Sequence, residues 1–560
     1  MTMTLAIAGG VACGPLLGLD DLFERPALTN GPGDGGDGSA SPGDGGADGE
    51  SAECISNAQC STNGSAALCV SSRCVAVDTT LCLPDVLPSN QVLASDDVAL
   101  FAAFVPFQGG KPPLTQVSAL AYGLAVDELS VGIPYDDNGT TRRRSVAIVL
   151  CASEPDVIES SVKHVTRDLR VPAMIAAFDN ASFPPLVQNY AVPEGVFTLN
   201  PSTTTEALRY QKNPLVWNLL GVPEDVALAY RPLLEGVERH LRSDGGVLGA
   251  SGEPLRVALL ATNTSAEESI RDLLVRGRRD PLDGGIDRDK ALSFNGMNVP
   301  DMPGDGGVKP NFRSITVNAL ENGEQPDYVG IKDALTGLDP HVVIALTRDE
   351  LPRIVEDLES PDGGAGLRPI WLLGPRNARE VLPHLAAGGF ADKQGRFLGV
   401  QYAGADDPTP KNDWLVRMGN KYPSVAQSDY SSAENFYDAV YWLAYGSAYP
   451  DGPLTGQAIG KGVRRLLAGT PIAPGSLNDV GLAFTTLGIA GTATFVGALG
   501  PPDINPELGT WNSVGGVYCF KSIGGVTIAP QYDVLRFNRG SGALDQRSQC
   551  FAGQFTTFGF

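Results

Sequence analysis

The stretch from residue 144 to residue 201 constrains the fold more than any other part of the 560-residue chain. A short run rich in Val and Ile, residues 145–150, is followed by apolar residues at helical spacing in 153–170. Two further apolar runs follow, at 171–177 and 196–199. Short apolar runs that alternate with helical segments are typical of parallel βαβ units. The sequence therefore predicts an α/β fold with mostly parallel sheets.

Two polar clusters follow predicted strands of this stretch, at residues 179–182 and 202–205. In parallel α/β sheets, ligands bind outside the carboxyl ends of the strands, which is where these clusters fall. Their side chains are mostly hydroxyls and amides, which favour hydrogen bonding to a ligand over acid–base chemistry.

The same alternation recurs along the chain, whose length predicts two or three domains. A strand at 98–107 and a helix at 114–129 precede the opening stretch, and a second series begins with a strand at 255–261. The segment 262–265 is expected to cap a helix at 266–275, with Glu267 and Glu268 in its first turn. Further strands are predicted at 341–346, 370–373 and 398–402, helices at 431–449 and 454–467, and mainly strands and turns from residue 480.

The net charge of −23 argues against nucleic acid and anionic membrane surfaces as partners. Residues 480–500 carry no charge, but their glycines, threonines and β-branched residues favour sheet and turns over a membrane span.

The nine cysteines are unevenly placed, and none forms a Cys-x-x-Cys pair of the kind that zinc sites use, so no metal site is expected. The cluster in 54–82 indicates a small disulfide-stapled module and an oxidising compartment; a set of free buried thiols is the alternative. With Cys13 set aside, eight cysteines remain to pair. We expect two bridges among Cys54, Cys60, Cys69 and Cys74, one bridge Cys82–Cys151, and one bridge Cys519–Cys550.

The N-terminal region contains no predicted core. Residues 1–18 are apolar up to Cys13 and resemble the end of a bacterial lipoprotein signal peptide, in which that cysteine is lipidated; an ordinary disordered terminus is the alternative. Residues 19–53 include a Gly- and Asp-rich segment that we expect to be a disordered linker. The predicted divisions are a signal remnant at 1–18, this linker, a Cys-rich module at 54–82 and a two-lobed domain at 92–560.

Catalytic motifs are not found. The four histidines are scattered, no Gly-x-Ser-x-Gly segment occurs, and Gly460-Lys461 is followed by Gly462 where a phosphate-binding loop needs Ser or Thr. Cys151 is better explained as a disulfide partner than as a nucleophile. We therefore expect neither an enzyme nor a cofactor.

The order of these segments is similar to that of the type I periplasmic binding proteins, in the branched-chain amino-acid (leucine) binding branch that serves ABC transporters. The resemblance runs from residue 98 to the C-terminus. It rests on 121–129 (AYGLAVDEL), 144–177, 256–274, 339–358, the Tyr437-Asp438-Ala439 and Leu454-Thr455-Gly456 motifs, and the glycine-rich turn at 491–500.

The resemblance implies two Rossmann-like lobes joined by three crossovers, with a ligand held in the cleft between them. In the second lobe the aromatic residue that the family places after the first strand is missing. Arg348 would favour an anionic ligand, whereas Asp349 or Glu350 would favour an amine. The expected ligand-binding residues are Gln108, Asn180, Ser182, Ser202, Thr204, Thr264 and Arg348.

The implied function is that of an extracytoplasmic solute-binding lipoprotein in the periplasm or outer envelope. It would bind a small amino acid, amide or organic acid for an ABC permease and touch the membrane only through its lipid anchor. A ligand-sensing receptor module of the same fold and a structural or adhesive envelope protein with a degenerate cleft are the alternatives.

Overall fold

The computed structural model describes residues 54–548, except the segments 62–65, 78, 108–112, 179–181, 203–212, 244–247, 250–251, 280–284, 305–307, 321–323, 360–366, 376, 379, 387–392, 394, 404–406, 426–432, 450–452, 489–490 and 524–526. The predictions for Cys13, Gln108, Asn180, Thr204 and Cys550 lie outside the described residues. Within the described part, every helix is too short or too polar to cross a bilayer.

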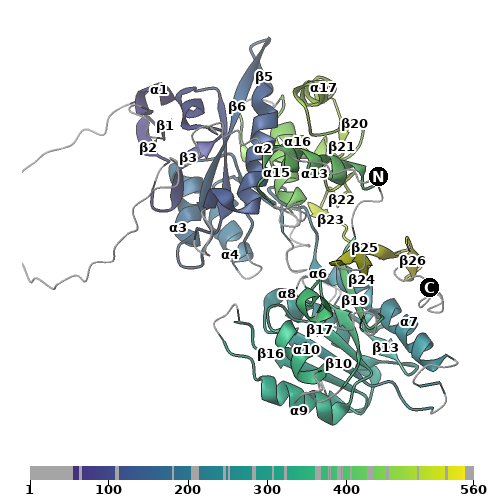
Figure 1. Ribbon diagram of the computed structural model, residues 1–560. Coiled ribbons are helices and arrows are strands. Elements are labelled where there is room, and N and C mark those ends of the chain that lie inside the picture. Colours follow the sequence, from purple (N-terminus) through teal and green to yellow (C-terminus); the bar gives the residue numbers. More distant parts are fainter. Residues whose placement is uncertain are drawn as a thin grey trace, which may run out of the picture.

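Two α/β lobes are built around two separate sheets, as Figure 1 shows. Each sheet has nine strands among the described residues. The chain passes between the lobes three times, between residues 218 and 223, between 402 and 409, and between 511 and 515. Each lobe therefore contains two segments that are far apart in the sequence. The predicted pair of mostly parallel lobes with three crossovers is confirmed.

The sheet of lobe 1 is parallel in its centre and antiparallel at its ends. Its parallel strands β4, β6, β7, β8 and β9 lie in the spatial order 2-1-3-4-5, which is a doubly wound arrangement. In order across the sheet the strands are β22 (Ile504–Asn505), β23 (Thr510–Trp511), β9 (Val216–Asn218), β8 (Phe197–Asn200), β7 (Ala173–Ile175), β4 (Val98–Val105), β6 (Thr140–Ala152) and β3 (Cys82–Leu87), with β5 (Ile133–Asp137) paired to β6.

Helices cover both faces of this sheet, because successive residues of its central strands point to opposite faces and are apolar on each. Phe101 and Ala103 of β4 pack with one set of helices, whereas Ala102 and Phe104 pack with the other. The first set is α2 (Val117–Glu128), α13 (Thr409–Lys421), α15 (Glu434–Gly446), α16 (Gly456–Arg464) and α17 (Leu477–Leu487), and the second set is α3 (Ile158–Lys163), η6 (His164–Asp168), α4 (Phe183–Leu186) and η7 (Val187–Ala191).

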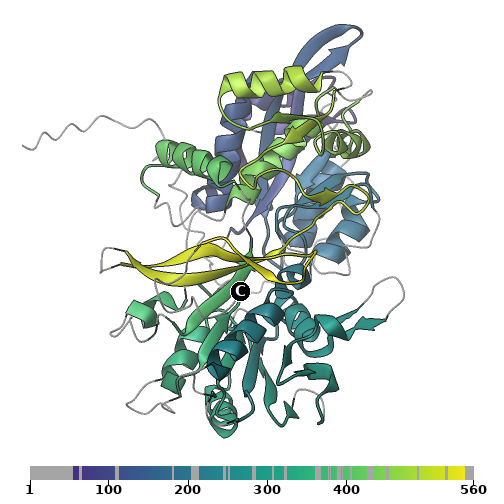
Figure 2. The same cartoon turned by 90° about the vertical axis from the view of Figure 1, so that its right-hand side faces the viewer.

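Lobe 2 repeats the arrangement, since its parallel strands β10, β16, β17, β18 and β19 also lie in the order 2-1-3-4-5. A long antiparallel hairpin, β24 and β25, extends its sheet on the side of β19; it is yellow in Figure 2. In order the strands are β15 (Val308–Lys309), β16 (Phe312–Val317), β10 (Val257–Thr262), β17 (Val342–Leu346), β18 (Ile370–Leu373), β19 (Phe397–Tyr402), β24 (Gly515–Ile523), β25 (Thr527–Phe537) and β26 (Leu544–Gln546).

The helices of lobe 2 bury its sheet in the same way. Those on one face are α6 (Pro223–Ala227), α7 (Tyr230–Arg242) and α8 (Ser265–Arg276), and those on the other are α9 (Tyr328–Leu338), α10 (Leu351–Glu359) and α11 (Leu382–Ala386). The segment between α8 and β16 carries β11 (Arg278–Arg279), β12 (Ile286–Asp287), β13 (Ser293–Phe294) and β14 (Met297–Asn298). It also contributes Leu292 and Phe294 to the core.

The Cys-rich segment consists of α1 (Asn57–Cys60), β1 (Ala67–Val70) and β2 (Arg73–Ala76) and packs on lobe 1, where Leu68 and Val77 join the core. The bridges Cys54–Cys69, Cys60–Cys74 and Cys82–Cys151 are present, in agreement with the predicted pairing. Cys519 is also disulfide-bonded.

The prediction of strands and turns from residue 480 is wrong for α17. Ser476 and Asp479 form a reciprocal capping box at its start, and Val480, Ala483, Phe484 and Leu487 bury one face. This cap and a buried stripe at helical spacing outweigh the weak helix propensity of the threonines and glycines.

Candidate functional site

The switch point of each sheet is the place where the strand order reverses, between strands one and three. It lies between β4 and β7 in lobe 1 and between β10 and β17 in lobe 2. In open α/β sheets, ligands bind at this point, outside the carboxyl ends of the strands. The loops that follow these four strands are therefore the first place to look for a site.

In lobe 1, the described polar residues at this edge include amides, hydroxyls and the carboxylate of Glu154, which accepts the backbone N–H of Phe107 in the loop after β4. Asn200, the last residue of β8, is buried and accepts a hydrogen bond from the backbone N–H of Ser202 at 2.8 Å. Asn435, in the first turn of α15, donates through its amide to the carbonyl oxygen of Pro201. The Oδ1 atom of Asn435 is buried without a hydrogen-bond partner among the described residues. Ser182 precedes α4 beyond the end of β7.

In lobe 2, an ion pair bridges the loops after β10 and β17. The guanidinium of Arg348 lies 3.3 Å (Nε to Oε1) and 3.4 Å (Nη2 to Oε2) from the carboxylate of Glu267. Thr264 is the N-cap residue of α8, within the segment predicted to cap this helix, but its hydroxyl donates to the same carboxylate and makes no cap hydrogen bond. Glu267 is buried and Arg348 is half-buried.

A second set of contacts holds these loops in place. Both carboxylate oxygens of Glu350 accept backbone N–H groups, from Leu320 at 2.7 Å and from Arg348 at 2.9 Å. Asn377, which follows β18, donates to the carbonyl oxygen of Thr347 at 2.6 Å. Thr347 is buried, and its Oγ1 atom has no partner among the described residues.

Tyr230, at the start of α7, lies at the carboxyl edge of lobe 2, beside the end of β18. Its hydroxyl donates to the carbonyl oxygen of Leu373 at 2.9 Å. Burial, and to a smaller extent the charge of Glu267, raise the pKa of Tyr230 far above its ordinary value. The phenol therefore stays neutral and acts as a fixed donor rather than as a base.

The three crossovers lie side by side and form the connection between the lobes. Ser513 donates to the carbonyl oxygen of Leu220, which joins the third crossover to the first. The backbone N–H of Ala403 donates to Val514 at 3.0 Å, which joins the second to the third. The first and second crossovers leave the carboxyl ends of β9 and β19. Both sheets therefore direct their carboxyl edges, and their switch points, toward this hinge.

A pocket of about 500 Å³ opens elsewhere on lobe 1, between the end of α2, the end of α13 and the start of α17. Its charges are already matched. Arg417 lies 2.6 Å from the carboxylate of Glu128, Tyr441 donates to the same carboxylate at 2.8 Å, and Lys421 pairs with Asp127. Because α2 starts at the carboxyl edge of the sheet and runs away from it, this pocket is remote from the switch point.

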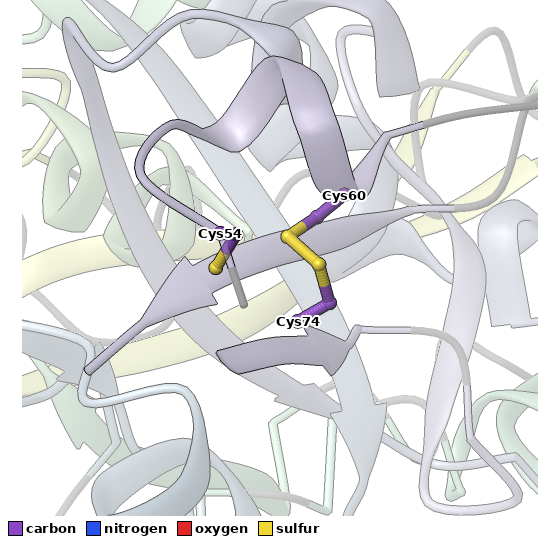
Figure 3. Close-up of side chains that lie close together, drawn as sticks. All are labelled: Cys54, Cys60 and Cys74. Carbon is purple, nitrogen blue, oxygen red and sulfur yellow. A yellow bond between two sulfur atoms is a disulfide. The ribbon is translucent and has the colours of Figure 1, made fainter. Parts of the chain in front are cut away.

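Three sulfur atoms of the Cys-rich segment, those of Cys54, Cys60 and Cys74, lie within 4.8 Å of one another. Figure 3 shows the sulfur of Cys54 beside the Cys60–Cys74 bridge. All three atoms belong to disulfides, and a disulfide sulfur is not the thiolate that binds a metal ion.

Of the predicted ligand-binding residues, Thr264 and Arg348 lie close together at the switch point of lobe 2, and Ser182 and Ser202 lie at the carboxyl edge of lobe 1. Whether they bind a ligand stays a prediction. Glu267 was not expected as the partner of Arg348, and neither Asn435 nor Thr347 was expected at the site. Glu267 was visible only as a helix-start residue, and its contact across 81 positions has no local signal.

No protein-family model matches the sequence, and no curated protein matches it. Solved structures do. The chain is similar to type I periplasmic binding proteins. One such protein from Bordetella pertussis aligns with a TM-score of 0.49 and 12% identity over 78% of this chain and 100% of its own.

Two other similar structures are solute-binding proteins of transporters. A branched-chain amino-acid transporter protein from Streptococcus pneumoniae, solved with isoleucine, aligns with a TM-score of 0.47 and 14% identity over 78% of this chain and 99% of its own. An ABC-transporter solute-binding protein from R. palustris, solved with benzoate, has a TM-score of 0.44 and 13% identity over 78% of this chain and 95% of its own. These likenesses are too distant to carry a functional assignment.

Proposed function

We propose that this chain is an extracytoplasmic solute-binding protein that holds a small polar ligand between its two lobes and delivers it to an ABC permease. The observation that carries the proposal is topological: two doubly wound sheets direct their switch points toward one three-stranded hinge. Hinge closure around a ligand is a standard motion of such two-lobed proteins.

The chemistry of the two edges supports binding rather than catalysis. Asn435 in lobe 1 and Thr347 in lobe 2 each keep a buried polar atom without a partner in the described part of the chain. An unsatisfied buried group costs about 1–3 kcal/mol and calls for an explanation, of which a binding site is one. Both groups are uncharged, which suits directional hydrogen bonding.

The compartment is inferred from the disulfides. Bridges such as Cys82–Cys151 persist in oxidising, extracytoplasmic compartments. We propose that Cys13 carries the lipid anchor, and that Gln108, Asn180 and Thr204 complete the lobe 1 side of the site with Ser182 and Ser202.

A thermal-shift screen of the full chain against amino acids, small amides and organic acids tests the proposal. A ligand present at 100 times its Kd stabilises the folded state by about 2.7 kcal/mol, which is a clear rise in Tm. Small-angle scattering in the presence of a compound that raises the Tm (the hit) should show a smaller radius of gyration, because the lobes close. The absence of stabilisation by every compound would reject the proposal in favour of a structural or adhesive envelope protein.

The residues are tested by calorimetry with the hit. Asn435→Ala and Thr204→Ala should weaken binding roughly ten-fold each, as loss of a buried hydrogen bond implies. Ser541→Ala, at an exposed turn of lobe 2, is the control. Unchanged affinity in both site variants would show that the ligand binds elsewhere.

A further inference from the structure

Arg348, the residue of lobe 2 that would favour an anionic ligand, already has a counter-charge within the protein. Arg348 presents two nitrogen atoms to the two oxygens of Glu267, at 3.3 and 3.4 Å, across the switch point. The two side chains are 21% and 10% exposed, so water screens the pair only in part. The hydroxyl of Thr264 donates to Glu267 as well and fixes the carboxylate in place.

A ligand carboxylate that took Arg348 would leave Glu267 buried without a counter-charge. Breaking a buried pair in this way costs more than one charge-assisted hydrogen bond returns. The other charges of the loop act in the same direction. Glu350, two residues after Arg348, is buried, and its carboxylate accepts two backbone N–H groups. Asp349 is exposed on the same loop. The edge of lobe 2 is therefore unfavourable for a negative group.

We propose that Glu267 determines the ligand specificity of this protein by excluding carboxylates from lobe 2. The part of the ligand that meets lobe 2 is then an amide, a hydroxyl or an ammonium group. This inference rests on the proposed function and narrows it, because organic acids that would need Arg348 are removed from the ligand class. Of the two alternatives that the sequence leaves open for this loop, it favours an amine over an anion.

The chain offers a matched pair of variants for the test. Glu267→Gln removes the negative charge and keeps an oxygen for Thr264 and for Arg348. Glu268→Gln removes the same charge one residue later, where the carboxylate is 44% exposed and faces Arg271 at 3.5 Å. The melting temperature of each variant without ligand shows whether it is folded.

The probes are benzamide with benzoate, and isobutyramide with isobutyrate and isobutylamine, measured by calorimetry on the full chain. In the unaltered protein and in Glu268→Gln, the amide or the amine should bind at least ten-fold tighter than the matching carboxylate. In Glu267→Gln this ratio should fall at least ten-fold, because the buried negative charge that opposes a ligand carboxylate beside Arg348 is gone. Equal affinities in the unaltered protein, or an unchanged ratio in Glu267→Gln, would overturn the inference while the proposed function stands.

A second measurement needs no organic ligand. Inorganic phosphate should raise the Tm of Glu267→Gln more than that of the unaltered protein or Glu268→Gln, because the carboxylate that competes with an anion for the Arg348 guanidinium is gone. If phosphate changed the Tm of all three proteins equally, the inference would be contradicted, but the proposed function would not. Failure of every organic probe to bind any of the three proteins would instead count against the proposed function, and the inference would fall with it.

Discussion

The carboxylate of Asp438 lies against Gly497 so closely that a Cβ atom on the glycine would be 2.3 Å from Oδ2. Asp438 is buried in α15 and accepts the backbone N–H groups of Ala498 at 2.7 Å and Leu499 at 2.8 Å. The helix and the glycine-rich turn that follows β21 (Ala493–Phe495) are thus held by one side chain. This contact places the Tyr-Asp-Ala motif directly against the glycine-rich turn.

Gly497→Ala should therefore destabilise lobe 1. The added methyl group has to displace a buried carboxylate that holds two backbone N–H groups, and overpacking of this kind costs about 1–3 kcal/mol. Gly481→Ala is the control, because nothing lies within 4 Å of a Cβ atom there and alanine favours the helix. Urea unfolding should show a lower free energy of unfolding for Gly497→Ala and no decrease for Gly481→Ala. Equal stabilities of the two variants would contradict the packing argument.

Patterns of apolar residues predicted the layers of this fold well, because a strand buried on both faces needs a continuous apolar run. β10 and β17 are predicted in this way, whereas Thr264 and Arg348, which follow them, are site candidates only through the family resemblance. The amphipathic helix α7 was overlooked although Leu233, Leu234, Val237 and Leu241 stand at helical spacing and are buried. Its signal was present in the sequence.

Other features could not be found by a local pattern. The contact of Asn435 with Pro201 joins residues 234 positions apart, and that of Arg348 with Glu267 depends on the strand order that brings β10 beside β17. Charge pairing at the site is decided by tertiary neighbours. The sequence therefore indicated which loops form the edge, but not which charges remain available there.

Acid should destabilise lobe 2 through Glu359, at the end of α10, whose side chain is only 5% exposed. Burial alone would raise the pKa of this carboxyl, but hydrogen bonds from Arg396 at 2.6 and 2.9 Å, together with His384, outweigh it and lower the pKa to about 2. A lowered folded pKa stabilises the protein above the unfolded value of 4.5, and this contribution is lost as the pH falls from 4.5 toward 2.

Glu359→Gln should remove that part of the pH dependence and should also lower the free energy of unfolding at pH 7 by about 3–5 kcal/mol, because Arg396 stays half-buried without its counter-charge. Glu356→Gln, on the exposed face of the same helix, is the matched control. Unfolding followed from pH 2 to pH 7 checks both points, and parallel curves for Glu359→Gln and the unaltered protein would refute the assignment.

The disulfide Cys82–Cys151 should matter more for stability than Cys60–Cys74. It closes a separation of 69 residues and ties β3 to β6, whereas the other bridge closes 14 residues within the Cys-rich segment. The loop-closure entropy predicts a difference of about 1.4 kcal/mol between them. Double alanine variants of each cysteine pair, compared by urea unfolding, test this prediction. A larger loss of unfolding free energy on removal of Cys60–Cys74 than on removal of Cys82–Cys151 would contradict it.

The hinge should depend on Gly221, in the first crossover. Its φ of +71° is unfavourable for other residues, and a Cβ atom would lie 2.3 Å from Oγ of Ser513 and 2.5 Å from the carbonyl oxygen of Trp511. Gly221→Ala should therefore separate the first crossover from the third. We expect weaker ligand binding and a changed radius of gyration, with both lobes still folded.

Gly252→Ala separates the two causes of this effect. Gly252 has a similar φ of +63°, but nothing lies within 4 Å of a Cβ atom there. It therefore carries the backbone strain of a positive φ without the clash. Scattering and calorimetry on both variants should show altered lobe geometry and affinity for Gly221→Ala alone, since only that substitution pushes two crossovers apart. If both variants or neither changed the radius of gyration, close packing of the crossovers would not control the hinge.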